Sequence, residues 1–277
     1  MTIKELQQNT YSQNIIDTAE VDSILSLALH KNLEYIYKNP DKKISLGTRK
    51  KFAKLIALRL QHWPLAYLRK NKYFFGLNFI VNRHTLIPRP DSELLVEEAI
   101  KYLNNSALRA ELKSPKILDM GTGSGCLIIS LAKNTIGEFF ASDLKKSALK
   151  IAKLNARKNK VKINFILSNL FTKIPEQNFD LILANLPYLT QKQMSEPSIK
   201  KEPRSALVSG LDGLDHYRKF FLQVTKYLNK KFCILLEMDP SQAMDLKNLS
   251  QQYFPQSKIE ILSDLNQKNR LIKIEQK

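Results

Sequence analysis

The sequence predicts an α/β protein in which a parallel β-sheet carries helices on both faces and a small helical domain precedes the sheet. Two observations support this prediction. Before about residue 70 only helical periodicity occurs, whereas beyond about residue 115 short apolar runs alternate with amphipathic or lysine-rich segments. Parallel strands need crossover connections and are buried on both faces, so such alternation is typical of a parallel sheet.

The first domain is expected to span residues 1–70. Apolar side chains recur at steps of three and four residues in "TAEVDSILSLALHKNLEYIYKN" (18–39) and in "SLGTRKKFAKLIALRLQ" (45–61). Pro40 and Asp41 interrupt the pattern between the two segments. These residues show no strand pattern, and we therefore expect helices throughout.

A short hairpin is expected to link the two domains. Aromatic and β-branched residues dominate "YFFGLNFIVNRHTLI" (73–87), and Gly76 lies among them. We place this linker at residues 71–90. The α/β domain then spans residues 91–277.

Five short apolar runs of the α/β domain are expected to form parallel strands. They are "KILDM" (116–120), "GEFFASD" (137–143), "KINFILS" (162–168), "FDLILAN" (179–185) and "KFCILLEM" (231–238). Helical segments such as "GCLIISLAKN", "KKSALKIAKLNARKN" and "HYRKFFLQVTKYLNK" separate them. The C-terminal "KIEILSDLNQKNRLIKIEQ" is expected to add a pair of strands, as a hairpin at the edge of the sheet.

Composition bounds the class of protein. The 277 residues are 43% hydrophobic, which is enough for a substantial core. No apolar run approaches the roughly 20 residues that a membrane-spanning helix needs, so we expect a cytoplasmic protein without membrane contact. Cys126 and Cys233 lie in apolar contexts, and the four histidines lack metal-ligand spacing. Neither a disulfide framework nor a metal site is predicted.

The formal net charge of +18 has two interpretations. Clustered cations could bind RNA or a ribosomal complex, because they neutralise phosphates and release counterions. Alternatively, the lysines reflect a bias along the whole chain and form a merely solvated surface. Only residues 48–54, 143–162 and 229–231 are dense in positive charge.

The first chemical motif is "ILDMGTGSGC" (117–126). An expected strand runs into Asp119 and is followed by Gly121, Gly123 and Gly125 and then by an apolar helix start. Glycines allow a tight turn and the close approach of a ligand, so a nucleotide-like ligand is expected here. A simple strand-to-helix turn is the alternative.

Asp143 ends the next expected strand, about 20 residues beyond the glycine loop. A carboxylate at this offset commonly receives ribose hydroxyls. It could instead be the N-cap of the following helix. The loop lacks the Lys-Ser/Thr of a P-loop and has Cys126 at the sixth position of the dinucleotide fingerprint. These two motifs leave dinucleotides and S-adenosylmethionine both open.

The third motif, "NLPY" (185–188), follows the fourth strand and resembles the signature of S-adenosylmethionine-dependent methyltransferases that act on a planar nitrogen. Such a nitrogen is a poor nucleophile, so the site must position it and accept its hydrogens. The Asn185 side-chain oxygen and the Leu186 carbonyl are two acceptors. Pro187 restricts the backbone of Leu186, and Tyr188 offers a flat wall. The alternative is a plain turn.

Several further segments resemble the peptide chain release factor glutamine methyltransferases. They are "PLAYL" (64–68), "YFFGLNFIVN" (73–82), "TLIPRPDSELLVEEAI" (85–100), "EPRSALVSGLDGLDHYRKF" (202–220), "ILLEMDPSQ" (234–242) and "DLNQKNR" (264–270). The resemblance implies a Rossmann-like S-adenosylmethionine-dependent methyltransferase fold with a small N-terminal helical domain. It also implies class I release factors as partners, methylated on the side-chain amide nitrogen of the glutamine in their Gly-Gly-Gln motif.

The resemblance further implies a cofactor-binding set for S-adenosylmethionine. The glycine loop would wrap the methionine part, Asp143 would hold the ribose, and Asn169 and Leu170 would lie beside the adenine. The whole set is Gly121, Thr122, Gly123, Ser124, Gly125, Asp143, Asn169, Leu170 and Asn185.

The substrate glutamine would be held by Asn185, Leu186, Pro187 and Tyr188, with Asn185 and Tyr188 as the catalytic residues. No metal is implied.

Two neighbouring segments are expected to be structural. In "PRPDSE" (88–93) we expect Asp91 or Ser92 to be the N-cap of a helix with Glu93 in its first turn. Glu202 and Arg204 are expected to form a local ion pair.

Three residues depart from the family pattern. Leu186 replaces a proline, Leu170 replaces an aromatic residue, and Lys70 stands where a glycine is usual. Asn-Leu-Pro-Tyr is also the form found in adenine-N6 RNA dimethyltransferases. Two alternatives therefore stay open: methylation of adenine in RNA or DNA, and a catalytically weak paralogue that binds cofactor or RNA.

Overall fold

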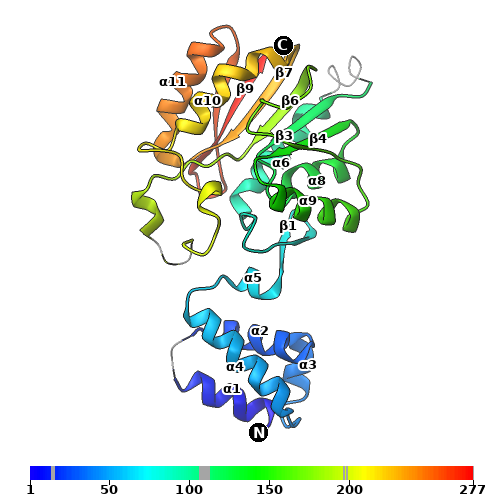
Figure 1. Cartoon of the computed structure of the whole chain (residues 1–277), viewed down its shortest axis with the longest axis vertical. Helices are drawn as coiled ribbons and strands as arrows, with labels where there is room; N and C mark the ends of the chain where they lie inside the picture. The colour runs from blue at the N-terminus through cyan, green and yellow to red at the C-terminus, as the bar shows by residue number, and fades with distance from the viewer. Residues whose placement is uncertain (14–15, 106–112, 196, 198, 277) are drawn as a thin grey trace. The chain divides into compact units, whose positions relative to one another are not determined.

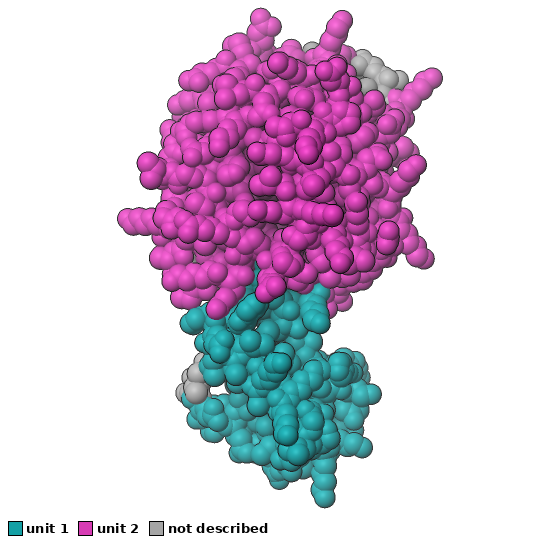
Figure 2. Space-filling view, viewed as in Figure 1, with its two compact units in different colours: residues 1–70 teal, residues 71–277 magenta. Residues whose placement is uncertain are grey.

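The structure, a computed structural model, describes residues 1–13, 16–105, 113–195, 197 and 199–276. The chain divides into two compact units, residues 1–70 and residues 71–277 (Figure 2). The hairpin that follows residue 70 belongs to the second unit.

The first unit is helical. Its helices are α1 (Ile3–Tyr11), α2 (Thr18–Leu29), α3 (Leu33–Lys38), α4 (Leu46–Leu60) and α5 (Leu65–Arg69). Side-chain caps set where they begin: Asp17 accepts the Ala19 N–H at 2.8 Å before α2, and Asn32 accepts the Tyr35 N–H at 2.9 Å before α3. Their apolar faces meet in one core, made of Ile3, Val21, Ile24, Leu25, Ala28, Ile36, Ile44 and Phe52.

Lys70 follows α5 with a φ of 58°, in the left-handed region. A side chain costs about 1–2 kcal/mol there, which glycine avoids. Because glycine also loses more backbone entropy, we expect Lys70→Gly to raise the free energy of unfolding by about 0.5–1 kcal/mol in urea titrations. As a control, Lys150→Gly within helix α9 should lower it by about 1 kcal/mol. Equal effects of the two changes would contradict the strain at residue 70.

A seven-stranded sheet forms the centre of the second unit, in the order β5-β4-β3-β6-β7-β9-β8 (Figure 1). Neighbouring strands pair in parallel except β9, which runs antiparallel to both β7 and β8. The strands are β3 (Lys116–Met120), β4 (Glu138–Asp143), β5 (Asn164–Leu167), β6 (Phe179–Ala184), β7 (Leu228–Glu237), β8 (Lys258–Ser263) and β9 (Asn269–Gln276). The predicted fold class is confirmed, including the C-terminal hairpin at the sheet edge.

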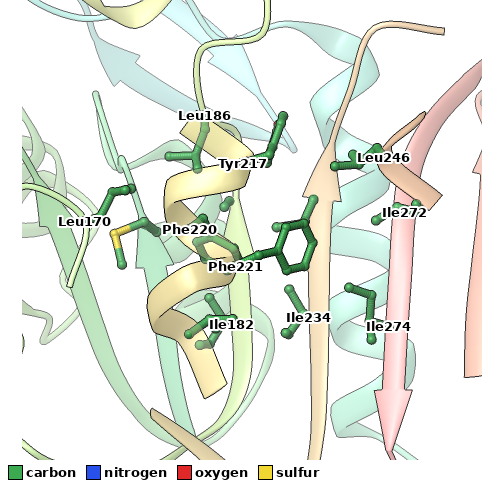
Figure 3. Packing of buried hydrophobic residues seen from close by; sticks show 14 of the residues in the cluster. Leu170, Ile182, Leu186, Tyr217, Phe220, Phe221, Ile234, Leu246, Ile272 and Ile274 are labelled. Atoms are coloured by element: carbon green, nitrogen blue, oxygen red, sulfur yellow. The ribbon is translucent and has the colours of Figure 1, made fainter. Parts of the chain in front are cut away.

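Two hydrophobic cores cover the two faces of the sheet. One core contains side chains of α6 (Glu93–Leu103), α8 (Cys126–Asn134) and α9 (Lys146–Lys158). The other contains side chains of α10 (Asp215–Val224) and α11 (Ala243–Tyr253), and Figure 3 shows Phe220 and Phe221 of α10 pointing toward the strands. Alternate residues of each central strand enter alternate cores: Ile182 faces α10, whereas Leu181 and Leu183 face α8.

A hairpin of β1 (Asn71–Phe74) and β2 (Leu77–Ile80) begins the second unit. Its turn residues Phe75 and Gly76 both have positive φ, 48° and 71°, as a tight two-residue turn requires. The buried Asn155 of α9 fixes the hairpin, because its side chain accepts the Ile80 N–H at 2.7 Å and donates to the Ile80 carbonyl at 2.9 Å. The same amide donates to the carbonyl of Ser124 at 2.8 Å and so joins the hairpin to the glycine loop.

Helix α11 is the main element that the sequence pattern did not predict. Its apolar residues are sparse and it has no side-chain cap of its own. The 3₁₀ turn Pro240–Gln242 directly before it has a capping box, in which Asp239 accepts the Ser241 N–H and Gln242 accepts the Asp239 N–H. Short 3₁₀ turns lie at Pro90–Ser92, Lys192–Ser195, Arg204–Ala206, Thr225–Tyr227 and Pro240–Gln242. Within the described ranges, no helix has the length and apolar character needed to cross a membrane.

Candidate active site

An open cavity lies where β3, β4, β5 and β6 end. This is the edge at which open α/β sheets bind their ligands. Most predicted site residues line it: Gly121, Thr122, Gly123, Ser124, Asp143, Asn169, Leu170, Asn185, Leu186 and Pro187. The structure therefore brings together the three motifs that the sequence places far apart. Gly125 and Tyr188 lie outside the lining.

The glycine loop folds back over the end of β4. The N–H groups of Gly121 and Thr122 both donate to the Ser142 carbonyl, at 2.9 and 2.8 Å. Gly121 has a φ of 76°, and a Cβ there would lie 3.2 Å from Cδ2 of Leu186. At Gly125, with a φ of 82°, a Cβ would lie 2.8 Å from Ile129. Gly121 thus permits contact with the Asn-Leu-Pro-Tyr motif, whereas Gly125 permits packing of α8.

Asp143 holds the loop through its carboxylate. Oδ2 accepts the Gly123 N–H at 2.9 Å and Oδ1 accepts the Lys145 N–H at 2.8 Å. Burial raises the pKa of Asp143, and these two amide hydrogen bonds oppose the rise. Helix α9 starts later, with Lys145 at its N-cap and no side-chain cap. Asp143 therefore does not cap α9, and each oxygen keeps acceptor capacity for a ligand hydroxyl.

Asp119 is fully buried beneath the loop. Its Oδ2 accepts the Thr122 hydroxyl at 2.6 Å, while Oδ1 has no hydrogen-bond partner among the described residues. Burial raises the pKa of Asp119 from 3.8 to about 7. Asp119 itself does not line the cavity, whereas Met120 and Thr122, next to it along the chain, do.

The pKa of Asp119 predicts a pH dependence of stability. Between about pH 4 and pH 7 the unfolded chain releases a proton that the folded protein retains, so rising pH favours unfolding. Asp119→Asn removes this titration. The free energy of unfolding of the variant, relative to wild type, should therefore increase by up to about 4 kcal/mol from pH 4 to pH 8 without cofactor. Urea titrations across this range measure it, and parallel pH profiles of the two proteins would contradict it.

Asn169 and Leu170 form another wall of the cavity after β5. The Ser168 hydroxyl donates to the Leu170 carbonyl at 2.7 Å and accepts the Lys173 N–H at 3.0 Å. Leu170 itself has a φ of 49° and a buried side chain, which Figure 3 shows above the strands at the edge of the α10 core. Leu170 thus presents apolar surface where the family pattern has an aromatic ring.

Asn185 and Leu186 follow β6 at the floor of the cavity. The Asn185 Nδ2 donates to the Ser92 Oγ at 3.1 Å. The Leu186 N–H lies near the Tyr217 hydroxyl, which donates to the Glu237 carbonyl. Among the described residues, neither the Asn185 Oδ1 nor the Leu186 carbonyl has a hydrogen-bond donor. Two acceptors are therefore available at one place in the cavity.

Tyr188 is directed toward the protein interior. Its hydroxyl donates to Glu237 Oε1 at 3.0 Å, and its ring packs against the α10 core. The side chain of Gln242 donates through Nε2 to the Tyr188 carbonyl at 2.8 Å. A role of Tyr188 as a wall for the substrate stays a prediction, whereas its contact with Glu237 is explicit.

The segment "PRPDSE" starts a helix as expected, since α6 begins at Glu93 and its N-cap is Ser92, one of the two expected residues. Ser92 stands at the N-cap position without a capping hydrogen bond, and Asp91 forms an ion pair with Arg270 at 2.9 Å. Glu93 accepts the Phe75 N–H at 2.8 Å. The three polar side chains make tertiary contacts, which a local pattern cannot show.

The predicted ion pair between Glu202 and Arg204 is wrong, because each residue has another partner. The carboxylate of Glu202 pairs with Arg89 and accepts the Ile87 N–H at 3.0 Å, whereas Arg204 contacts Gln191. The buried Glu202 is therefore paired with Arg89, which is distant in sequence, and not with Arg204 two residues away. Residues 87–89 are thereby tied to residues 202–206, and members of both segments line the cavity.

Ser92, Arg89 and His216 line the cavity although sequence reasoning did not assign them to it. Burial lowers the pKa of His216, whose Nδ1 lies 2.8 Å from the Ser209 hydroxyl. The sequence did give one indication of these three residues, because each lies in a segment that resembles the family. In the part of the chain that the structure describes, no group of histidine, cysteine or acidic residues could hold a metal ion.

Comparisons with known proteins identify the family to which the chain is similar. Residues 4–69 match the PrmC N-terminal domain, and residues 94–207 match the methyltransferase small domain. The release factor glutamine methyltransferase of Bacillus anthracis is 30% identical over 273 residues, which cover 96% of this chain and 94% of that protein. The chain belongs to the release factor glutamine methyltransferase family. The resemblance noted in the sequence is thus confirmed.

Other members of the family and more distant structures extend this picture. The family member of Geobacter sulfurreducens is 32% identical, covering 81% of this chain and 78% of that protein. A bifunctional methyltransferase of Rickettsia bellii is 33% identical over 92% of this chain, which spans about half (50%) of that longer protein. The Thermus thermophilus 16S rRNA N2 G1207 methyltransferase, in complex with AdoMet and guanosine, shares the fold at 16% identity, with a TM-score of 0.53 over 75% of this chain and 50% of that chain.

The protein is therefore an S-adenosylmethionine-dependent methyltransferase. The residues at the cavity fit this cofactor. Asp143 offers acceptors for ribose hydroxyls, and the glycine loop leaves room for a ligand at the strand ends. The binding role of each residue remains a proposal.

Proposed function

We propose that this protein methylates the side-chain amide nitrogen of the glutamine in the Gly-Gly-Gln motif of class I peptide chain release factors, in the cytoplasm. The proposal is supported by relatives that are named release factor glutamine methyltransferases and match nearly the whole chain. The cavity chemistry supports the same reaction, because it provides acceptors for an amide nitrogen.

The observation that carries the proposal is the pair of acceptors at the end of β6. A primary amide nitrogen has two hydrogens, and its lone pair is delocalised into the carbonyl. Asn185 Oδ1 and the Leu186 carbonyl are suited to accept one hydrogen each, which fixes the nitrogen and favours the build-up of electron density on it. Gly121 lies against Leu186, so the acceptors adjoin the glycine loop.

S-adenosylmethionine supplies an electrophilic methyl group on a sulfonium centre. The residues of the chain contribute orientation and electrostatics: the glycine loop and Asp143 hold the cofactor, and Asn185 and Leu186 hold the nitrogen that attacks. The excess proton of the methylated nitrogen leaves along one of these hydrogen bonds to solvent at the open mouth of the cavity. Positioning and preorganised dipoles are the main sources of acceleration.

The test is methylation of a purified class I release factor. The full chain is incubated with S-adenosylmethionine and the release factor, and the peptide that contains Gly-Gly-Gln is examined by mass spectrometry. We expect the mass gain of one methyl group on the glutamine. A release factor whose motif is changed to Gly-Gly-Glu is the matched control and should not be methylated.

Two other results would replace the proposal. Labelled methyl in RNA or DNA, without label in the release factor, would establish a nucleic-acid methyltransferase, for which the charge of +18 is favourable. Binding of S-adenosylmethionine in calorimetry without methylation of either substrate would indicate a paralogue that has lost turnover.

A further inference from the structure

Ser92 lies between Asn185 and a buried carboxylate. Its own exposed fraction is 2%, it lines the cavity, and its Oγ accepts from Asn185 Nδ2 at 3.1 Å. On its other side the Ser92 hydroxyl interacts with Glu237, whose exposed fraction is 3% and which ends β7. Three side chains from separate parts of the sequence thus lie together, with a hydrogen bond from Asn185 to Ser92 and with Glu237 Oε2 buried and unpartnered among the described residues.

The direction of these bonds is determined by what each group can donate. Glu237 Oε2 is buried without a hydrogen-bond donor among the described residues, which makes it the acceptor available for the single hydrogen of Ser92. The Ser92 oxygen can then only accept from Asn185, and this requires the Nδ2 of the asparagine to face Ser92. The amide oxygen of Asn185 consequently faces away from Ser92, where no described residue donates to it.

Orientation matters because the two flip states of an asparagine amide have nearly the same shape but opposite polarity. Only the state with Oδ1 toward the substrate can accept a hydrogen from the reacting nitrogen. In the other state, two donors would oppose the hydrogens of the substrate. A serine that accepts from Nδ2 therefore selects the productive state.

We propose that Ser92 is a positioning residue that fixes the flip state of the Asn185 amide by passing its own hydrogen to Glu237. The inference rests on the proposed function, because it concerns the acceptor of the glutamine nitrogen. In the family pattern a proline at position 186 restrains Asn185. Leu186 provides no such ring here, and the hydrogen bond to Ser92 is a restraint that Asn185 retains.

Glu237 is held in place by its own contacts. Tyr188 donates to its Oε1, and the Tyr217 hydroxyl donates to its backbone carbonyl. Arg270 and Asp91, which form an ion pair with each other, are the other charged groups that act on the carboxylate. Burial raises the pKa of Glu237, whereas the hydroxyls of Ser92 and Tyr188 and the charge of Arg270 lower it.

The test compares Ser92→Ala, Ser92→Thr and Ser250→Ala in release factor methylation. We expect Ser92→Ala to lower kcat by about 10- to 100-fold, while KM and the Kd of S-adenosylmethionine stay within about threefold. Ser92→Thr keeps the hydroxyl and should recover most of the lost kcat. Ser250 is a matched control, because it is equally buried and its hydroxyl makes one hydrogen bond, at 2.7 Å to the Leu246 carbonyl.

A second variant tests the other end of the chain and also covers the case in which Ser92→Ala does not fold. Glu237→Gln removes the charge that takes the Ser92 hydrogen and should lower kcat by about tenfold with cofactor affinity retained. Asp180→Asn is its control, since Asp180 is a buried carboxylate at the opposite end of the strands.

The outcomes separate this inference from the proposed function. Methylation by the wild type together with an unchanged kcat in Ser92→Ala, or in Glu237→Gln where the alanine variant does not fold, would overturn the inference alone. A loss that appears in cofactor Kd rather than in kcat would do the same. No methylation of the release factor by the wild type would instead overturn the proposed function.

Discussion

Replacing Asn185 with alanine is expected to lower kcat for methyl transfer by about 10²- to 10³-fold and to change the Kd of S-adenosylmethionine by less than about threefold. The Asn185 Oδ1 has no donor among the described residues, so the acceptor is available to the substrate and is lost in the variant. The side chain contributes mainly to the transition state, in which the nitrogen becomes positively charged. Steady-state kinetics and calorimetry measure the two quantities separately.

Asn159→Ala is the control for this change. The Asn159 side chain also makes one hydrogen bond through Nδ2, at 2.9 Å to the Asn155 carbonyl, and it does not line the cavity. Its removal should leave kcat within about twofold. Full activity of Asn185→Ala would exclude the acceptor mechanism, and an equal loss of kcat and cofactor affinity would point to a collapsed cavity.

The sheet could be predicted from the sequence because its central strands are buried on both faces and read as continuous apolar runs. The run "KILDM" coincides with β3 residue for residue. Strand β7 begins at Leu228, before the predicted residue 231, because Asn229, Lys230 and Lys231 are polar and partly or fully exposed. A pattern based on burial finds the buried part of a strand and misses its exposed end.

The residues that line the cavity at the strand ends could also be predicted from the apolar strand pattern. The glycine loop, Asp143 and Asn185 each follow a recognisable strand, and in a parallel sheet the carboxyl ends of strands meet at one edge. Order along the chain is therefore enough to place these residues in one cavity.

The residues that support the site could not be predicted in this way. Ser92 is 93 positions from Asn185, and Glu202 is 113 positions from Arg89, so no local spacing connects them. The sequence does single out Glu237, because it is a charged residue within the apolar run "ILLEM" (234–238). A buried carboxylate needs partners, but the sequence does not identify them.

The structure also changes how the departure at residue 186 is understood. A leucine in place of proline restores a backbone N–H, and this N–H lies near the buried Tyr217 hydroxyl, which donates to the Glu237 carbonyl. Figure 3 shows Tyr217 and Leu186 close together above the strands. The Leu186 backbone is thus packed beside a buried tyrosine where the family pattern has a ring, and its carbonyl has no donor among the described residues.

The largest effect on cofactor binding is expected from Asp143→Ala, which should weaken the Kd of S-adenosylmethionine by about 10²-fold or more. Two effects combine. The acceptors for the ribose hydroxyls are lost, at about 1.5–3 kcal/mol for each hydrogen bond to a charged group. The N–H groups of Gly123 and Lys145 also lose their acceptor, so the glycine loop is no longer held in the shape that the cofactor requires.

Comparison with Asp143→Asn separates these two effects, because an amide oxygen can still accept one N–H while the charge is absent. We expect this variant to bind the cofactor with an affinity between those of wild type and Asp143→Ala. Asp245→Ala, at an exposed position of α11, should leave the Kd unchanged. If Asp143→Ala binds S-adenosylmethionine within about threefold of wild type in calorimetry, the ribose is held elsewhere and Asp143 serves only to shape the loop.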